Sequence, residues 1–478
     1  MIIDKVTQGT QLTKQEGKTT MRQEKDSIGV FNIPDNAYYG VQTARALENF
    51  PISGINADID FIKASVIIKK AAAKVNASLG QIDKKISEAI ISASDEVLSG
   101  KLLDNFVVDV YQAGAGTSHN MNINEVLANR AIELLGGVKG DYKVVSPNDH
   151  VNCAQSTNDF FPTTMRLAAL IKSKELFKAL EECSNTLSQK ATEYFPIIKA
   201  GRTHLQDAVP VRLGREFQVY SRIFHDHKIR IENALAELKV LGIGGTAAGT
   251  GLNAHPQYQP QIVTELSKLL SLDLQGASDL MLAMQSMAPF VSISSAIKNF
   301  ALDLTKVCND LRLMDSGPTS GLSEIKLPAV QPGSSIMPGK VNPSMIEMLN
   351  QVCFQVIGCS TTIEYSSQAG QFELNVMMPV INHNLLHSMK ILTNALNIWN
   401  EKCLKGITAN PDRCKEYAQK SVSNATALNP LLGYLKTAEV VKEALATGKT
   451  IEQICLEKNL VEANKLKEVL DLEKQVGK

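Results

Sequence analysis

Five long segments with almost no glycine or proline make up the middle of the chain. Both residues interrupt helices, so their absence favours long helices. In the first segment apolar side chains recur three or seven residues apart, the spacing of one helical face. The segments are Thr163–Phe195, Arg215–Leu241, Phe290–Ser316, a fourth that begins at Pro343 and stays apolar to Ile357, and Val380–Lys405. Each of the longer ones would span roughly 40–50 Å.

Helices of that length need one another to bury their apolar faces. The sequence therefore predicts a mainly α fold built on an elongated antiparallel bundle of five helices. Such a bundle exposes much surface for its mass and buries its remaining apolar area best against copies of itself. We expect an oligomer.

Smaller regions flank the predicted bundle. The N-terminal side contains helical pieces at Phe61–Val75 and Ile86–Ser99 between turn-rich stretches. On the C-terminal side, Thr450 and Gln453 have the spacing of a capping box at the start of a helix over Ile451–Lys458, and a second helix is expected over Leu460–Leu472. The predicted domains are a disordered extension (1–20), an N-terminal mixed domain (21–157), the helical bundle (158–412) and a small C-terminal helical domain (413–478).

Composition and charge exclude several classes of protein. The 478 residues carry 49 basic and 49 acidic side chains, so nothing favours nucleic acid or an acidic membrane as a partner. No apolar run approaches the roughly 18 residues of a membrane span. The start of the chain lacks the apolar core of a signal peptide, and none of the eight cysteines forms a CxxC pair. We expect a cytoplasmic protein with reduced thiols.

Four short segments interrupt the helical pattern with small and polar residues. Their side chains are mostly uncharged hydrogen-bonding groups, with a few histidines and one lysine. That inventory suits a small dicarboxylate, whose oxygens accept several neutral donors and one or two cations. The segments are Gly114–Glu125, Ser146–Asp159, Gly201–Asp207 and Gly333–Pro343. Taken singly, each could be an ordinary helix cap or a solvated loop.

The last of these segments carries two adjacent hydroxyls, two glycines, a lysine and an asparagine between prolines. We expect Asn342 to cap the following helix and Pro343 to occupy its first turn. A mobile polar loop that bears a cation and ends at a helix N-terminus is suited to closing over an anion.

Two other patterns resemble binding motifs but lack the right context. Gly242–Ala247 fits GxGxxA, yet it follows a long predicted helix rather than a strand, so we reject dinucleotide binding. His225 and His227 lie two residues apart, which places them on different sides of a helix, and we reject a metal pair.

The four polar segments, in this order and spacing, resemble the fumarase/aspartase superfamily, whose signature loop reads GSSxxPxKxN. The resemblance extends from about residue 21 to the C-terminus. Within the superfamily, Gly114–Ser118 and Gln155–Asp159 are more similar to the aspartase (aspartate ammonia-lyase) family than to fumarases, and Ala46–Pro51 points weakly the same way. The first twenty residues have no counterpart, so Met21 is an alternative start.

The resemblance implies a three-domain fold and a homotetramer with a core of twenty helices, in which segments of three subunits form each active site. It implies reversible deamination of L-aspartate to fumarate and ammonia by anti elimination through an aci-carboxylate. No cofactor or metal would be required, although divalent cations could activate the enzyme. Class II fumarase, which would interconvert malate and fumarate, is the alternative, and a catalytically silent structural relative is a further one.

Individual roles also follow from the resemblance. Ser334 on the flexible loop would be the general base, and His204 with Asn158 would lie near the leaving amino group. The other matching positions would bind the two carboxylates of the substrate: Thr117, Ser156, Thr157 and Ser335 the one whose charge grows, and Thr203, Lys340 and Asn342 the other. Met378 departs from the family pattern, because many aspartases have glutamate there.

Overall fold

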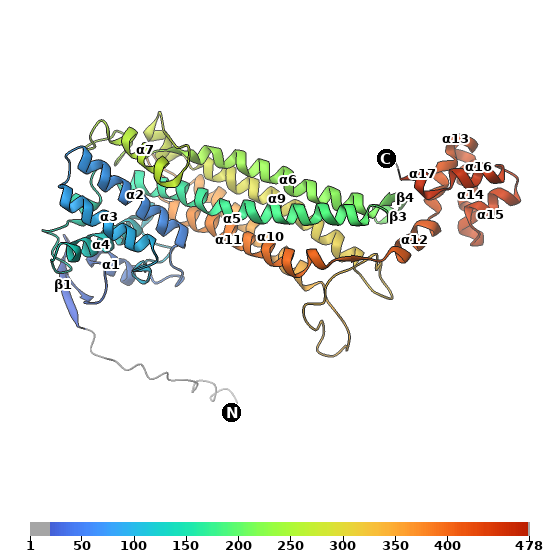
Figure 1. The fold of residues 1–478 in the computed structure, drawn as a ribbon, viewed down its shortest axis with the longest axis horizontal. Coiled ribbons are helices and arrows are strands. Elements are labelled where there is room, and N and C mark those ends of the chain that lie inside the picture. Colours follow the sequence, from blue (N-terminus) through green and yellow to red (C-terminus); the bar gives the residue numbers. More distant parts are fainter. Residues whose placement is uncertain (1–19, 477–478) are drawn as a thin grey trace, which may run out of the picture. The chain divides into compact units, whose positions relative to one another are not determined.

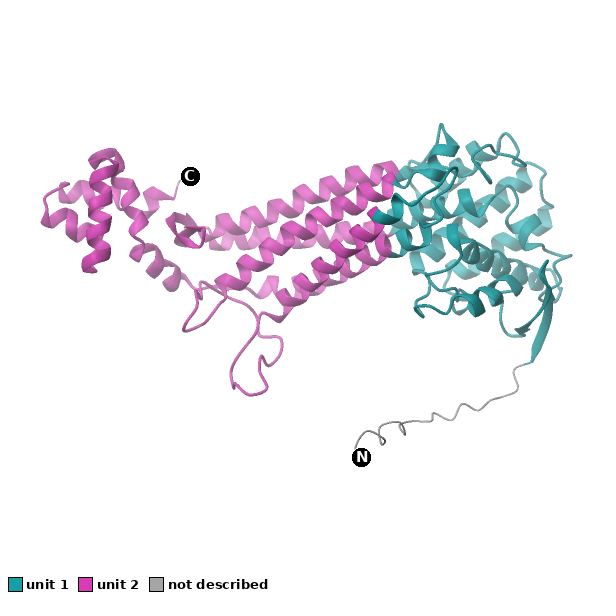
Figure 2. Cartoon of the chain, turned by 180° about the vertical axis from the view of Figure 1, so that it is seen from behind, with its two compact units in different colours: residues 1–171, 238–287, 365–383 teal, residues 172–237, 288–364, 384–478 magenta. Residues whose placement is uncertain are grey.

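The fold is mainly helical, as the sequence predicts. The structure is a computed structural model that describes residues 20–476, so nearly all of the predicted N-terminal extension lies outside the described residues. The chain divides into two compact units (Figure 2). Unit 1 comprises the described residues up to Ile171 with Leu238–Met287 and Tyr365–His383, and unit 2 comprises Lys172–Glu237, Ala288–Glu364 and the described residues from Asn384 onward.

Unit 1 packs short and medium helices around a main apolar core, with a smaller apolar cluster at Ile33, Ala37, Val41 and Ala44. Its strands β1 (Met21–Lys25) and β2 (Val30–Pro34) form an antiparallel hairpin, and β5 (Val240–Leu241) pairs in parallel with β6 (Gln275–Gly276). The core is built largely from α2, α3 and α4, with residues such as Val66, Ile90 and Ile123 fully buried. The helices that lie wholly in this unit are α1 (Val41–Asn49), α2 (Ile59–Ser78), α3 (Lys84–Leu98), α4 (Thr117–Leu134), α7 (Tyr258–Leu270) and α8 (Leu280–Gln285), with a π-helical turn at Pro147–Val151.

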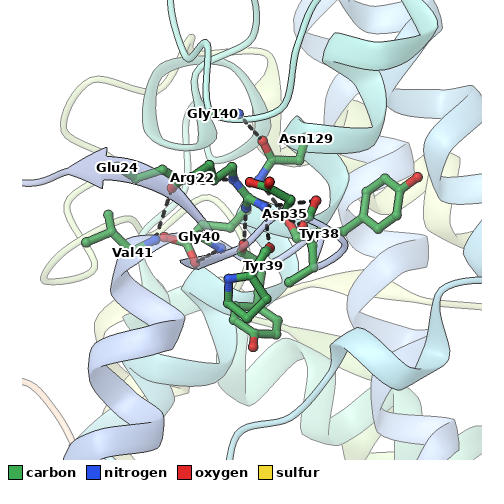
Figure 3. A network of polar contacts seen from close by, with 12 residues as sticks. Arg22, Glu24, Asp35, Tyr38, Tyr39, Gly40, Val41, Asn129 and Gly140 are labelled. Carbon is green, nitrogen blue, oxygen red and sulfur yellow. Dashed lines mark hydrogen bonds and ion pairs between the residues drawn. The ribbon is translucent and has the colours of Figure 1, made fainter. Parts of the chain in front are cut away.

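A polar network fastens the β1–β2 hairpin and the segment after it to α4 (Figure 3). The Arg22 guanidinium donates to the backbone oxygens of Pro34, Ala37 and Tyr39 at 2.7–2.8 Å and pairs with Glu24. The Asn129 side chain of α4 donates to the backbone carbonyl of Tyr38 and accepts from the Gly140 amide. These bonds hold α4, whose first turn carries Thr117.

The five long helices expected from the sequence are present. They are α5 (Thr157–Tyr194), α6 (Leu213–Ala236), α9 (Ala288–Met314), α10 (Ser344–Ser367) and α11 (Met378–Lys402). Within unit 2 they lie side by side (Figure 1). Phe224 of α6 packs edge-on against Phe300 of α9 and stacks on Trp399 of α11. Because the pairs 298/364 and 309/350 both join α9 to α10, these two helices run antiparallel.

Several boundaries differ from the prediction. Helix α5 begins at Thr157 rather than Thr163, since Pro162 is accommodated inside its first turns. Helix α10 continues through Gly358 to Ser367. The capping box of Thr450 and Gln453 is confirmed.

The C-terminal residues form short helices around their own apolar core, which includes Leu428, Ile454 and Leu466. The helix expected over Leu460–Leu472 is present but shorter, because α16 ends at Val469 and a separate short helix, α17, begins at Leu472. The helices are α12 (Pro411–Lys420), α13 (Asn429–Leu432), α14 (Tyr434–Thr447), α15 (Ile451–Glu457), α16 (Ala463–Val469) and α17 (Leu472–Gln475). No helix among residues 20–476 has the length and apolarity that crossing a membrane requires.

Candidate active site

Two of the predicted polar segments meet in unit 1. Thr117 is the first residue of α4 and is exposed, while Thr157 is the first residue of α5 and is buried. The Asn120 amide donates to Thr157 Oγ1 at 3.0 Å, which ties the two helix starts together. The turn into α4 requires Gly116, which has φ +84°, and a Cβ there would lie 2.1 Å from the Phe161 ring. The structure thus brings Thr117, Ser156, Thr157 and Asn158 into one unit, on two adjoining segments.

A buried lysine that sequence reasoning missed supports this group. The Lys69 ammonium of α2 is fully buried, donates to Asn152 Oδ1 and Gln155 Oε1 at 2.9 Å each, and lies 3.9 Å from the centre of the Phe160 ring. Burial holds the pKa of Lys69 well below its ordinary value, although the charge of Asp159 opposes this. The ammonium fixes the turn that leads into Ser156.

The glycine-rich pattern rejected as a nucleotide motif has a different partner. The amides of Gly244 and Thr246 donate to Asp159 Oδ2 at 2.9 and 3.0 Å, and the Ser156 amide donates to Oδ1 at 2.9 Å. Burial raises the pKa of Asp159 to about 6 against the lowering effect of these amides and of Lys69. The amides of this turn therefore bind a carboxylate of the chain itself.

The third polar segment forms a hairpin in unit 2. Strands β3 (Ile198–Thr203) and β4 (Gln206–Arg212) pair antiparallel, with His204 and Leu205 at the turn. Both turn residues have positive φ, 55° and 57°, which matches the mirror-image turns that close two-residue hairpins. Thr203 and His204 are exposed.

A buried carboxylate joins this hairpin to the strand that precedes the signature loop. Glu324 is fully buried and pairs with Arg202 and Lys199 of β3 at 2.9 and 3.1 Å. It directly precedes β7 (Ile325–Lys326), which pairs with β8 (Thr408–Ala409). The hairpin and the start of the loop are thereby linked within one unit.

The signature loop is shaped by its own polar groups. Ser334 Oγ accepts hydrogen bonds from the amides of Ile336 and Met337 at 3.2 and 3.0 Å. Two amide donors directed at this oxygen would favour its ionised form, as a serine base requires. The loop is closed at its base by the Gly333 amide, which donates to the Lys340 carbonyl at 2.8 Å.

The expectation that Asn342 caps α10 is wrong. The Asn342 side-chain nitrogen, Nδ2, donates to the Gly333 carbonyl at 2.7 Å, and Asn342 Oδ1 accepts from Lys340 Nζ at 2.6 Å. The carbonyl of Pro343 instead accepts the first helical bonds, from Ile346 and Glu347, so Pro343 precedes the helix that begins at Ser344. Instead of capping α10, Asn342 closes the base of the loop by its hydrogen bonds with Gly333 and Lys340.

The predicted site residues therefore fall into two sets, one in each unit. Set 1 contains Thr117, Ser156, Thr157 and Asn158, and set 2 contains Thr203, His204, Ser334, Ser335, Lys340 and Asn342. Buried charged residues to which the sequence prediction gave no role support both sets. Lys69 and Asp159 hold the turn around Ser156 in set 1, and Glu324 pairs with Arg202, next to Thr203 of set 2. One signal for Lys69 was available: Ser65, Lys69 and Asn76 lie on one face of α2, among apolar residues such as Ile62 and Ala72. Among residues 20–476, no group of three or more His, Cys, Asp or Glu side chains is placed to hold a metal ion.

This fold and these segments define a lyase built on a helical bundle. Residues 29–358 match the family model described as "Lyase", and residues 425–476 match the one described as "Fumarase C C-terminus". The chain belongs to this lyase family, within the fumarase/aspartase superfamily, and the resemblance read from the sequence is confirmed.

Individual proteins are similar to the chain along nearly its whole length. The chain is 49% identical to the aspartate ammonia-lyase of a Bacillus species, over 95% of this chain and 97% of that protein, and 45% identical to that of Escherichia coli K12, over 95% of each. A Brucella melitensis structure described as fumarate lyase:delta crystallin bound to cobalt superposes with a TM-score of 0.93 at 44% identity, covering 96% of this chain and all of that one. The class II fumarase of Schistosoma mansoni gives a TM-score of 0.92 at 36% identity, covering 95% and 99%.

Proposed function

We propose that the chain is an aspartate ammonia-lyase that reversibly converts L-aspartate into fumarate and ammonia. The observation that carries the proposal is the similarity, along nearly the whole chain, to proteins named aspartate ammonia-lyase. Intact Ser334, Lys340, Asn342 and His204 argue against a catalytically silent relative.

The proposed chemistry needs a base and a site for growing negative charge. Ser334 Oγ takes the proton from the carbon next to one carboxylate, and the bonding electrons pass into that carboxylate to give the aci-carboxylate. The electrons return to form the carbon–carbon double bond as the carbon–nitrogen bond breaks, and ammonia leaves with that bonding pair. The two amides on Ser334 Oγ support this role, since they stabilise its alkoxide.

The remaining residues bind and orient the substrate in this proposal. Thr117, Ser156, Thr157 and Ser335 donate to the carboxylate whose charge grows, and Thr203, Lys340 and Asn342 hold the other carboxylate. Asn158 and His204 face the amino group. The chain supplies its own base and cation, so the elimination itself requires no cofactor. A rise in rate with added magnesium and its loss with a chelator would reveal activation by a divalent cation.

The proposed active form is a cytoplasmic homotetramer in which three subunits contribute to each site. Exposed apolar side chains on the bundle helices support association, since they would otherwise face water; they include Val219, Leu302, Phe354 and Ile398.

The ultraviolet absorbance of fumarate tests the function. Purified protein incubated with L-aspartate should produce fumarate, protein given L-malate should produce far less, and Ser334→Ala should lose at least about 10²-fold in kcat. Strong turnover of malate without turnover of aspartate would favour the class II fumarase alternative, which the likeness to the Schistosoma enzyme keeps open. Unchanged turnover by Ser334→Ala would remove the base assignment alone.

A further inference from the structure

The Asp159 carboxylate joins two segments that are far apart in the sequence. Its Oδ1 accepts from the Ser156 amide of the predicted substrate-binding segment, and its Oδ2 accepts from the amides of Gly244 and Thr246. The side chain is fully buried, so all three bonds form away from water. Hydrogen bonds to a buried carboxylate are stronger than those between neutral groups. Asp159 therefore holds the Gly244–Ala247 turn against the start of α5.

The same turn fixes the orientation of the Asn158 amide. Asn158 Nδ2 donates to the Ala247 carbonyl at 2.8 Å. A backbone carbonyl can only accept, so the nitrogen end of the amide must face it. Asn158 Oδ1 accepts no hydrogen bond among the described residues, which leaves an acceptor rather than a donor for a ligand.

An acceptor in this place matches an ammonium group. The protonated amino group of aspartate has only hydrogen-bond donors, so it would be attracted to Oδ1 and repelled by the NH₂ end of a flipped amide. Flipping would also place Oδ1 against the Ala247 carbonyl, oxygen against oxygen. The Ala247 carbonyl thus determines which end of Asn158 the substrate meets.

The turn needs Asp159 to keep this shape. Thr246 has φ +55°, a conformation that residues other than glycine seldom adopt, and Gly244 has φ +98°. A Cβ at Gly245 would lie 2.7 Å from the sulfur of Met284, so the turn is also tightly packed. Two amide bonds to one carboxylate offset the cost of these backbone conformations.

We propose that Asp159 is a positioning residue that acts through the Gly244–Ala247 turn to present Asn158 Oδ1 to the amino group of the substrate. The inference rests on the proposed function for the identity of the amino group. Burial raises the pKa of Asp159 to about 6, whereas its three amide donors and Lys69 favour the charged carboxylate.

The test compares the two substrates of the reverse reaction, ammonia and fumarate. In Asp159→Ala all three amides lose their acceptor. We expect the KM for ammonia to rise by about 10-fold or more. The KM for fumarate should rise by only about 2–3-fold, because Ser156, which also loses a partner, is one of several residues proposed to bind the carboxylates. Asp159→Asn can accept from Ser156 or from the turn, but not from both, and should shift the ammonia KM in the same direction by less. If Asp159→Ala does not assemble, the KM values of Asp159→Asn for ammonia and fumarate test the inference.

Asp109 provides a matched control, because it too accepts from backbone amides in unit 1, those of Ser53, Gly54 and Tyr111. Asp109→Ala should lower the melting temperature without raising the ammonia KM selectively. Equal changes in both KM values for Asp159→Ala and Asp159→Asn would overturn the inference, since a merely structural role predicts them.

Hydrogen exchange measures the contact without activity. The amides of Gly244 and Thr246 should exchange at least about 10-fold faster in Asp159→Ala than in the wild type, because their acceptor is gone. Unchanged exchange would overturn the inference alone. If the wild type does not convert aspartate, the proposed function fails and the assignment of the ligand fails with it, while faster exchange would still establish that Asp159 holds the turn.

Discussion

At the scale of single residues, Gly333 shows how tightly the base of the signature loop is built. The Gly333 backbone amide donates to the Lys340 carbonyl at 2.8 Å. The Gly333 carbonyl accepts from the side-chain amide of Asn342. A Cβ on Gly333 would lie 2.3 Å from the Lys340 oxygen and 2.8 Å from the Asn342 nitrogen. Any side chain at this position must therefore displace two residues predicted to bind a substrate carboxylate.

Gly333→Ala should consequently weaken substrate binding more than it weakens the fold. We expect kcat/KM for aspartate to fall by at least about 10-fold, because the backbone of Lys340 must shift. The melting temperature should change little, since the loop is largely exposed. Initial rates over a range of aspartate concentrations and a thermal melt measure the two effects.

Gly339→Ala is the matched control in the same loop. Gly339 has φ +83°, but no atom lies within 4 Å of the place that a Cβ would occupy, so alanine there introduces backbone strain of about 1 kcal/mol without a clash. It should reduce kcat/KM less than Gly333→Ala does. Equal losses in the two variants would mean that loop flexibility, rather than the close approach of Gly333 to Lys340, limits binding.

The candidate site residues could be proposed from the sequence, through its resemblance to a known family, but the contacts that support them could not. Ser334, Lys340 and Asn342 are singled out because they match the signature loop of the family, whereas the loop alone could have been an ordinary solvated one. Glu324 does not stand out, since a charged residue before a short strand normally faces water. Lys69 differs from the other lysines of α2 only by the helix face that it shares with Ser65 and Asn76. Only the fold brings Asn152 and Gln155 to Lys69, across more than 80 residues of sequence.

At the scale of elements, helix α1 begins without a capping side chain of its own. Its N-cap is Gly40, and the free amides of its first turn donate to two glutamates elsewhere in the chain. Glu125 of α4 accepts from Gly40, Gln42 and Thr43, and Glu24 of β1 accepts from Val41. The positive end of the helix dipole favours carboxylates in this place. The start of α1 is thus stabilised by β1 and α4 together.

Burial raises the pKa of Glu125 from its ordinary 4.5 to about 7, although the Thr43 hydroxyl and three amides lower it. Between these two values the folded protein retains a proton that the unfolded chain has lost. Stability should therefore fall as the pH rises from about 4.5 to 7, by up to about 3 kcal/mol from this group. Two other titratable groups lie near Glu125: Tyr142 and Glu24, which accepts a hydrogen bond from the Tyr142 hydroxyl.

Glu125→Gln should reduce this pH dependence, because glutamine does not ionise. Denaturant unfolding of the wild type and the variant at one protein concentration, at pH 5 and pH 8, measures the difference. Glu133→Gln, on the same helix but more exposed, should leave the pH dependence as it is in the wild type. Parallel pH profiles for wild type and Glu125→Gln would show that Glu125 has no shifted titration.

The long helices could be predicted from the sequence, but some of their ends could not. The five bundle helices followed from long stretches without glycine or proline. Pro162 lies inside α5, where the sequence rule would end a helix, and Gly358 lies inside α10. The strand pair β7–β8 joins residues more than 80 positions apart, so no local pattern could predict it.

At the scale of the whole molecule, the predicted site residues are divided between unit 1 and unit 2. Thr117 belongs to unit 1 and Ser334 to unit 2. If the proposed homotetramer completes each site with segments from different subunits, two inactive variants can restore each other. One subunit would supply an intact Thr117 and another an intact Ser334 to the same site.

Mixing Thr117→Val with Ser334→Ala tests this arrangement. Thr117 is exposed and Ser334 is half-buried in a surface loop, so both variants should fold. After joint unfolding and refolding in equal amounts, each site has one chance in two of receiving each intact segment, so activity should recover to about a quarter of the wild-type value. Each variant refolded alone should remain nearly inactive. A mixture no more active than the separate variants, with mixed tetramers confirmed by native mass spectrometry, would mean that Thr117 and Ser334 of one site come from the same subunit.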